Sequence, residues 1–288
     1  MKNIIIISNT KSFAEISLIN SSFVNEFKDN LIFCDNVSPA SLDYFPNLFT
    51  IFNGKYLKEN KYSENELLNL LYEQYNTQAI YSSDEIGVLF ENKVERILKY
   101  ENLYELETSL TQIKLTNTLK PTFTFIEFNN EKYNYKVNMD KIEGNFYKTI
   151  KNNLDDYIIF YIGNIKMNDQ DTAINRLPMF FVMSEIYGYS HYCDELVRII
   201  DIFPTLLNLL EINHPSKSSS ILPLFKGENF RILPTITDTS ILENGVNQAL
   251  KIKSENQEFQ IMWDELNQTF KVYDLFNDPI CSTDLIKL

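Results

Sequence analysis

The side chains that most often do chemistry in proteins are scarce in this sequence. It has two histidines, His191 and His214, and three cysteines, Cys34, Cys193 and Cys281. His191 and Cys193 stand close together in YSHYCDE, where they could supply two soft metal ligands or a thiol and its base. No second pair accompanies them and no C-x-x-C occurs, so we expect reduced thiols, without a structural zinc site or a disulfide framework.

The stretch YIIFYIGNIK, residues 157–166, raises the question of what its end can bind. Its apolar and aromatic start indicates a strand buried on both faces, and such strands in α/β proteins usually present functional groups where they stop. Here the strand stops at Gly163, Asn164, Ile165 and Lys166. These residues offer one neutral amide and one ammonium group, which bind little by themselves.

Further segments must position these residues. Apolar runs typical of strands are NIIIIS, LIFCDNV, QAIYSS, TFTFIEF and PMFFVM. Helices are expected in SENELLNLLYEQY, which begins with a capping box of Ser63 and Glu66, in residues 140–153, and in IFPTLLNLLEI, with Pro204 in its first turn. Strands that alternate with helices favour an α/β fold, with a central, mostly parallel sheet covered by helices on both faces.

The pattern of apolar and polar residues changes from about Asn229. The short segments RILPTIT, ALKIKS, EFQIMWDE and TFKVYDL alternate in the way that an antiparallel sheet does. We therefore expect two units: an α/β core over 1–227, and a small C-terminal α+β subdomain over 228–288 that packs on the core. The polar segment HPSKSSS, residues 214–220, is the expected linker.

The composition of the chain argues against some classes of partner and location. A formal charge of -13 argues against a nucleic-acid partner, because nucleic-acid binders gain much of their affinity from Lys and Arg. No apolar run approaches the ~18 residues of a membrane span, and the run from Ile4 to Ile7 is too short for a signal peptide. We expect a soluble, cytoplasmic protein.

Three segments together resemble one family. KVYDLFNDPICSTDLI, RIIDIFPTLLNLLEI followed by SSILPLFKGE, and ENELLNLLYEQYNTQAIYSS are similar in order and spacing to segments of the sulfatase branch of the alkaline-phosphatase superfamily. That branch includes phosphoethanolamine and phosphoglycerol transferases. The resemblance implies an alkaline-phosphatase-like core. It also implies one or two divalent metals held by Asp, Asn and His at the carboxyl ends of the strands, beside a formylglycine, Thr or Ser nucleophile.

The family's nucleophile segment is similar to YFPNLFTIFNG, residues 44–54. Tyr44 falls on the nucleophile in this alignment, and Leu48 on the arginine that supports it. An alignment with the phosphoethanolamine transferases would instead use an earlier hydroxyl, Ser41 or Ser38.

The resemblance also places the metal ligands. An acidic ligand after the first strand becomes Thr10, which is followed by Lys11, and a histidine after TFTFIEF has only Glu131 nearby. The central Asp-His pair, after the strand that begins at Tyr157, becomes Asn164 and Ile165, followed by Lys166. A metal site needs its charged ligands, so we expect no metal and no other cofactor.

The economical interpretation is a sulfatase-like pseudoenzyme that binds or scaffolds, with a sulfated, phosphorylated or glycan ligand. Thr10, Lys11, Glu131, Asn164 and Lys166 are the candidates for its pocket, the two lysines replacing the charge of the metal.

Two alternatives stay open. One is a divergent ester hydrolase or transferase that uses Ser41 as nucleophile and a divalent metal on Asp35, Asp43 or Glu131. The other is a structural partner of an active paralogue or of a glycan-assembly enzyme, as a protein complex or homo-oligomer. Bound metal and turnover separate the first alternative from the pseudoenzyme, and co-purification identifies the second.

Overall fold

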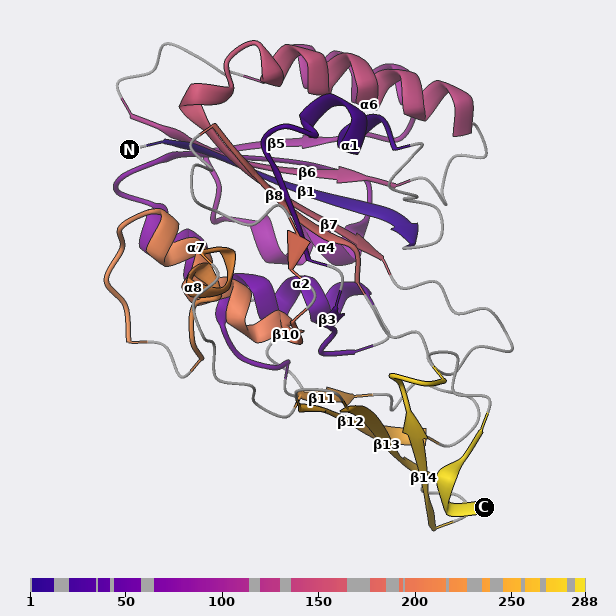
Figure 1. The fold of residues 1–288 in the computed structure, drawn as a ribbon. Helices are drawn as coiled ribbons and strands as arrows, with labels where there is room; N and C mark the ends of the chain where they lie inside the picture. The colour runs from indigo at the N-terminus through magenta and orange to yellow at the C-terminus, as the bar shows by residue number, and fades with distance from the viewer. Residues whose placement is uncertain are drawn as a thin grey trace.

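The fold is seen in a computed structural model of the chain (Figure 1). The structure describes residues 2–12, 21–34, 36–41, 44–57, 65–113, 120–129, 136–164, 177–184, 192–193, 195–215, 218–226, 235–238, 246–254, 257–264, 268–278 and 283–287. None of the helices within these ranges is long and apolar enough to cross a membrane.

A central sheet of eight strands forms the core. In spatial order the strands are β5 (Arg96–Lys99), β4 (Asn76–Tyr81), β6 (Thr122–Phe128), β1 (Asn3–Ser12), β7 (Tyr157–Asn164), β8 (Met179–Met183), β2 (Leu31–Cys34) and β9 (Tyr192–Cys193). β8 runs antiparallel to its neighbours β7 and β2, and the other pairs are parallel. The expected mostly parallel sheet is therefore confirmed.

The four isoleucines of β1 explain why this strand lies in the middle. Ile4 and Ile6 join the apolar cluster on one face of the sheet, while Ile5 and Ile7 join the cluster on the other, and none is more than 1% exposed. Neighbouring strands β6 and β7 hydrogen-bond to both edges of β1. A β-branched run without alternation is stable only where helices cover both faces.

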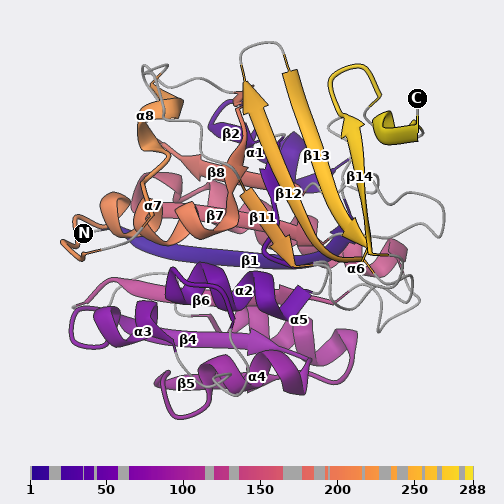
Figure 2. The ribbon, with the colours of Figure 1, turned by 90° about the horizontal axis from the view of Figure 1, so that it is seen from below.

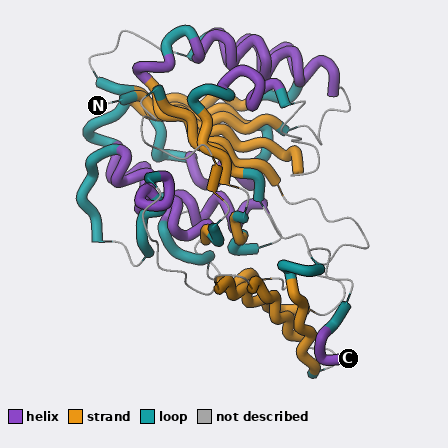
Figure 3. The backbone as a smooth tube through the Cα atoms, in the orientation of Figure 1, coloured by secondary structure: helices purple, strands orange, loops and turns teal. Residues whose placement is uncertain are grey.

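Helices cover both faces of this sheet, as Figure 3 shows. On one face lie α2 (Tyr44–Asn53), α3 (Glu66–Leu71), α4 (Asp84–Phe90), α7 (Ile202–Leu209) and α8 (Leu222–Phe225). On the other lie α1 (Ser22–Phe27), α5 (Leu103–Thr111) and α6 (Lys136–Lys151). We call these the α2 face and the α6 face. The 3-10 turns η1 (Leu154–Asp156), η2 (Ile199–Asp201) and η3 (Leu285–Lys287) complete the helical elements of the described residues.

The start of α3 differs from the prediction. The helix was expected to begin with a capping box at Ser63, which lies outside the described residues. It begins instead at Glu66, and Asn65 is its N-cap, because the Asn65 side chain accepts a hydrogen bond from the Leu68 amide at 3.0 Å. The side chain of Asn53 also accepts the Glu66 amide at 2.9 Å, so a residue of α2 helps to fix this end.

Two smaller sheets accompany the core. β3 (Val37–Ser38) pairs in parallel with β10 (Val197–Arg198). Near the C-terminus, β11 (Thr235–Asp238), β12 (Val246–Ser254), β13 (Gln257–Asp264) and β14 (Thr269–Asp274) form an antiparallel sheet in chain order (Figure 2). This is the small C-terminal sheet expected from the sequence. The exact boundary at 227–228 remains a prediction, since residues 227–234 lie outside the described ranges.

Candidate functional site

The carboxyl edge of the central sheet is the place to look for a site. The parallel strands β1, β6 and β7 point their ends to the same edge (Figure 1). β2 ends there too, because it is separated from β7 only by the antiparallel β8. In open α/β sheets, ligands bind outside this edge.

The end of β1 carries two of the predicted pocket residues, Thr10 and Lys11. Asn9 and Lys11 both contact Glu143 of α6, so they lie on the α6 face. Thr10 stands between them and is 8% exposed, in a stretch where the pairing of β1 with β7 is irregular between Ser8 and Ser12. The contacts of Lys11 thus place one of the two candidates against α6.

Lys11 forms a partly buried ionic cluster with α6. Its Nζ lies 2.6 Å from Oδ1 of Asp140 and 3.2 Å from each carboxylate oxygen of Glu143. Asn9 Nδ2 donates to Glu143 Oε1 at 3.3 Å, and the Tyr147 hydroxyl donates to Glu143 Oε2 at 3.3 Å. The Glu143 side chain is 3% exposed and that of Lys11 is 14% exposed. This cluster fastens the end of β1 to α6.

The two charges of the cluster affect each other's titration. Burial raises the pKa of Glu143, and the nearby Lys11 ammonium opposes that rise. Burial lowers the pKa of Lys11, but Glu143 and Asp140 together outweigh this effect and raise it above its ordinary value. The charge of Lys11 is thus compensated by protein carboxylates, and its role in a ligand pocket stays a prediction.

A second buried carboxylate, Glu127, lies at the end of β6. Its Oε2 accepts hydrogen bonds from the backbone amides of Ser82 at 2.7 Å and Ser83 at 3.1 Å, where β4 passes into α4. The Tyr100 hydroxyl donates to the Glu127 carbonyl oxygen at 2.8 Å. These bonds join the ends of β4 and β6, so Glu127 holds two strand ends in register.

The hydroxyl candidates follow β2 along the chain: Ser38 ends β3, Ser41 lies between β3 and α2, and Tyr44 is the first residue of α2. Ser38 is 1% and Ser41 7% exposed. The side chain of Asn47 accepts the Ser41 amide at 3.2 Å and donates to the Ser41 carbonyl oxygen at 2.8 Å. One side chain in the first turn of α2 thus fixes the backbone of Ser41.

The remaining candidates are only partly described. Asn164 is the last residue of β7 and the register partner of Ser12 at the end of β1, so it lies at the carboxyl edge as expected. Glu131, Lys166, Asp35, Asp43 and His191 lie outside the described residues. Within the described ranges, no three His, Cys, Asp or Glu side chains come together in a way that could hold a metal ion.

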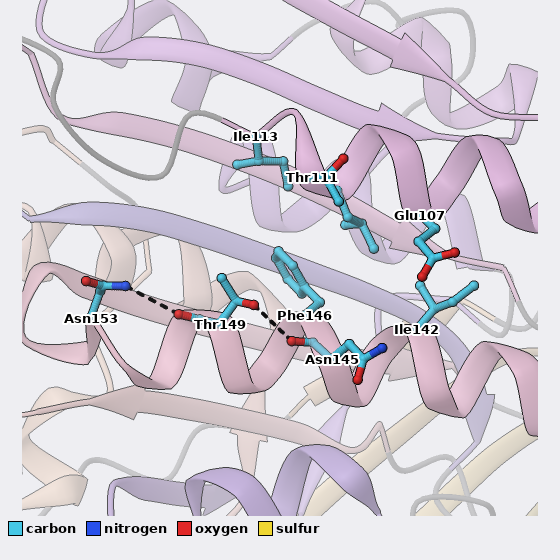
Figure 4. A pocket seen from close by; sticks show the side chains of 9 residues that line it. Glu107, Thr111, Ile113, Ile142, Asn145, Phe146, Thr149 and Asn153 are labelled. Carbon is cyan, nitrogen blue, oxygen red and sulfur yellow. Dashed lines mark hydrogen bonds between the residues drawn. The ribbon is translucent and has the colours of Figure 1, made fainter.

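A separate hollow of about 560 Å³ lies between α5 and α6 (Figure 4). Its apolar floor is Leu110, Ile113, Ile142 and Phe146, each no more than 8% exposed. The Thr149 hydroxyl is already used, because it donates to the Asn145 carbonyl oxygen at 3.0 Å. The hollow belongs to the α6 face and is not lined by any of the predicted site residues.

Sequence reasoning missed the carboxylates that occupy the edge. Glu143 could have been found, because Met139, Ile142, Phe146 and Tyr147 are the buried stripe of α6 and a glutamate at that helical position must be buried with them. Nothing in the sequence, in contrast, identifies Lys11 as the partner of Glu143, 132 residues away.

Known proteins give the same fold. No protein-family model matches the sequence, and a search of curated proteins gives no match. Solved structures do match: Ps i-CgsB in complex with k-i-k-neocarrahexaose has a TM-score of 0.73 at 12% identity, covering 99% of this chain and 89% of that chain. A protein in the alkaline phosphatase superfamily from Vibrio parahaemolyticus has a TM-score of 0.69 at 14% identity, covering 99% and 86%.

A third match is the lipoteichoic acid synthase LtaP from Listeria monocytogenes, with a TM-score of 0.63 at 12% identity over 96% of this chain and 88% of that chain. Another matching structure is described as a putative sulfatase from Bacteroides thetaiotaomicron, with a TM-score of 0.71 at 12% identity. The chain therefore has the sulfatase-like fold of the alkaline-phosphatase superfamily, and the expected fold is confirmed. Likeness at this level of identity establishes the fold and not the activity.

Proposed function

We propose that this chain is a sulfatase-like protein that has lost metal-dependent ester hydrolysis and acts as a binding or scaffolding protein. One observation carries the proposal: the buried carboxylates of the carboxyl edge are already bound within the protein. Glu127 holds the amides of Ser82 and Ser83, and Glu143 holds Lys11. A carboxylate engaged in this way is a poor ligand for a hard cation, which needs its oxygens.

The chemistry of the edge supports a polar ligand. Thr10 near the end of β1, Ser41 before α2 and Asn164 at the end of β7 carry neutral hydroxyl and amide groups. Such groups suit the hydroxyl, sulfate or phosphate oxygens of a glycan or anionic small molecule. Ps i-CgsB, with the same fold, was solved with an oligosaccharide. Of the two lysines predicted for the pocket, Lys166 is the one that we expect to balance an anion, because Lys11 pairs with Asp140 and Glu143 of α6.

The test is isothermal titration of the purified chain with inorganic sulfate, inorganic phosphate and a sulfated oligosaccharide, alongside metal analysis and ester-hydrolysis assays. We expect binding of at least one of these ligands, no stoichiometric metal and no turnover. Lys166→Ala should weaken binding of the anion, whereas Lys141→Ala, on the exposed side of α6, should leave it unchanged. Absence of binding to all three ligands would contradict the proposed ligand class.

A hydrolase or transferase with Ser41 as nucleophile is the second candidate. It is favoured by the Asn47 side chain, which fixes the backbone of Ser41 on both sides just before α2. Such preorganisation is what a nucleophile needs. Stoichiometric zinc, calcium or manganese together with turnover that is lost in Ser41→Ala would establish this candidate and overturn the first.

A further inference from the structure

Two cysteines far apart in the sequence lie side by side in the central sheet. β2 and β9 pair in parallel, and the register partners are Phe33 with Tyr192 and Cys34 with Cys193. Both thiols are reduced and buried, Cys34 at 0% and Cys193 at 5% exposure. Nothing in the sequence predicts that the two cysteines meet, because they lie far apart in the chain, at positions 34 and 193.

The two cysteine side chains also share a face of the sheet. Cys34 and Cys193 both belong to the apolar cluster of the α2 face. The preceding partners confirm the register from the other face, where the rings of Phe33 and Tyr192 are 5.8 Å apart. Because side chains alternate along each strand, this places both Cβ atoms on the same side of neighbouring strands.

The backbone spacing suits a covalent bond between them. Neighbouring strands lie about 4.7–4.9 Å apart, and disulfide-bonded cysteines have Cα atoms about 4.4–6.8 Å apart. β9 is a strand of only two residues at the edge of the sheet, so it can adjust to the bond more easily than a central strand. Cys34, in contrast, is fixed between β8 and β9.

The position of the pair links it to the candidate site. Cys34 is the last residue of β2, directly before the segment that carries Ser38 and Ser41. Just beyond Cys193, the chain returns to this segment, where the Val197 amide donates to the Asn36 carbonyl oxygen at 2.9 Å. A bond between the two cysteines would therefore fasten both chain segments at the base of the site.

We propose that Cys34 and Cys193 are a dithiol site that a low-molecular-weight disulfide, such as oxidised glutathione, converts to an intramolecular disulfide. The Cys193 thiolate, at the more exposed position, attacks the disulfide and releases one glutathione thiolate. Cys34 then displaces the second glutathione from the mixed disulfide. The two protein thiols lose two protons and two electrons, and one oxidised glutathione becomes two reduced molecules.

The experiment uses the full chain with Cys281→Ser, which removes the third thiol and keeps the proposed pair. After native treatment with oxidised glutathione, peptide mapping without reduction should find the peptides of Cys34 and Cys193 linked, with a loss of two hydrogens. The melting temperature should rise by roughly 5–10 °C and fall back on reduction, because the bond closes a long loop of the unfolded chain.

Two matched variants and a second probe make the outcome decisive. Cys34→Ser and Cys193→Ser, each with Cys281→Ser, should show no link and no rise in melting temperature. Phenylarsine oxide, which bridges adjacent thiols, should bind the Cys281→Ser protein one to one and protect both thiols from alkylation. The proposal would be overturned by a mixed disulfide with glutathione that persists without the link between Cys34 and Cys193, together with no arsenical binding. It would also be overturned if the link formed only in the chain that keeps Cys281.

Discussion

Replacing Lys11 by methionine tests whether the ionic cluster holds the end of β1 to α6. The substitution keeps most of the side-chain volume and removes the ammonium that lies 3.2 Å from both oxygens of Glu143 and 2.6 Å from Asp140. Glu143, with 3% side-chain exposure, then loses the ammonium group that compensates its charge. Breaking a buried pair in this way costs about 3–5 kcal/mol, so we expect the free energy of unfolding to fall by that amount near pH 8.

The loss of stability in Lys11→Met should depend on pH, because a protonated Glu143 is neutral and needs no compensating cation. Burial already raises the pKa of Glu143 above its ordinary value of 4.5, and without Lys11 the pKa rises further. A raised pKa in the folded state means that stability is highest below the unfolded pKa and is lost as pH rises through the folded one. Between the folded pKa of Glu143 in the parent protein and its higher folded pKa in Lys11→Met, the free energy of unfolding of the variant should fall by about 1.4 kcal/mol per pH unit relative to the parent.

Urea denaturation at pH 5, 6, 7 and 8 measures this dependence. Lys99→Met is the matched control, because Lys99 pairs with Asp84 in an exposed ion pair that contributes only about 0–1 kcal/mol. A double variant, Lys11→Met with Glu143→Leu, should recover much of the loss and remove its pH dependence. Equal, pH-independent losses in Lys11→Met and Lys99→Met would refute the cluster as a stabilising element.

Three more substitutions test other parts of the fold by the same urea denaturation. Gly54→Ala should cost about 2–4 kcal/mol, because Gly54 has a φ of 60° and a Cβ there would lie 2.5 Å from the Phe203 ring; a neutral result would contradict this backbone conformation. Asp201→Asn should cost about 2–3 kcal/mol, since Asp201 is buried and accepts two hydrogen bonds from Arg198; no loss would show the pair to be dispensable. Glu127→Gln should cost about 1–2 kcal/mol by weakening bonds to two backbone amides, and a larger effect on ligand binding than on unfolding would instead place Glu127 in the site.

The fold could be predicted because the pattern of apolar and polar residues within each segment indicates which of its faces are buried. The run of Ile4 to Ile7 has no polar alternation, so it requires cover on both faces, and the structure gives it that cover. The change to short alternating segments near the C-terminus likewise predicts the antiparallel sheet from Thr235 to Asp274. Helix ends were less certain: Asn65 and Ser63 are both good caps, and only the neighbouring Asn53 of α2 shows why the helix starts after Asn65.

The site could be predicted only as positions along the chain. Strand order brings Thr10, Asn164 and the Ser41 segment to one edge, which follows from the parallel strands. The direction of each side chain and its partner depend on packing between distant elements. The sequence places Lys11 next to Thr10, but only the packing of α6 on the sheet shows that Lys11 pairs with Glu143.

Contacts on the α6 face would hold the end of β1 in place even if residues on the α2 face were replaced. On the α6 face, Asn9 and Lys11 secure the end of β1 through Glu143, and the bonds are made entirely within the protein. On the α2 face, the Ser8 hydroxyl is buried and makes no hydrogen bond to the described residues. Because these contacts of β1 lie on the α6 face, residues on the other side of the strand can be replaced without breaking them.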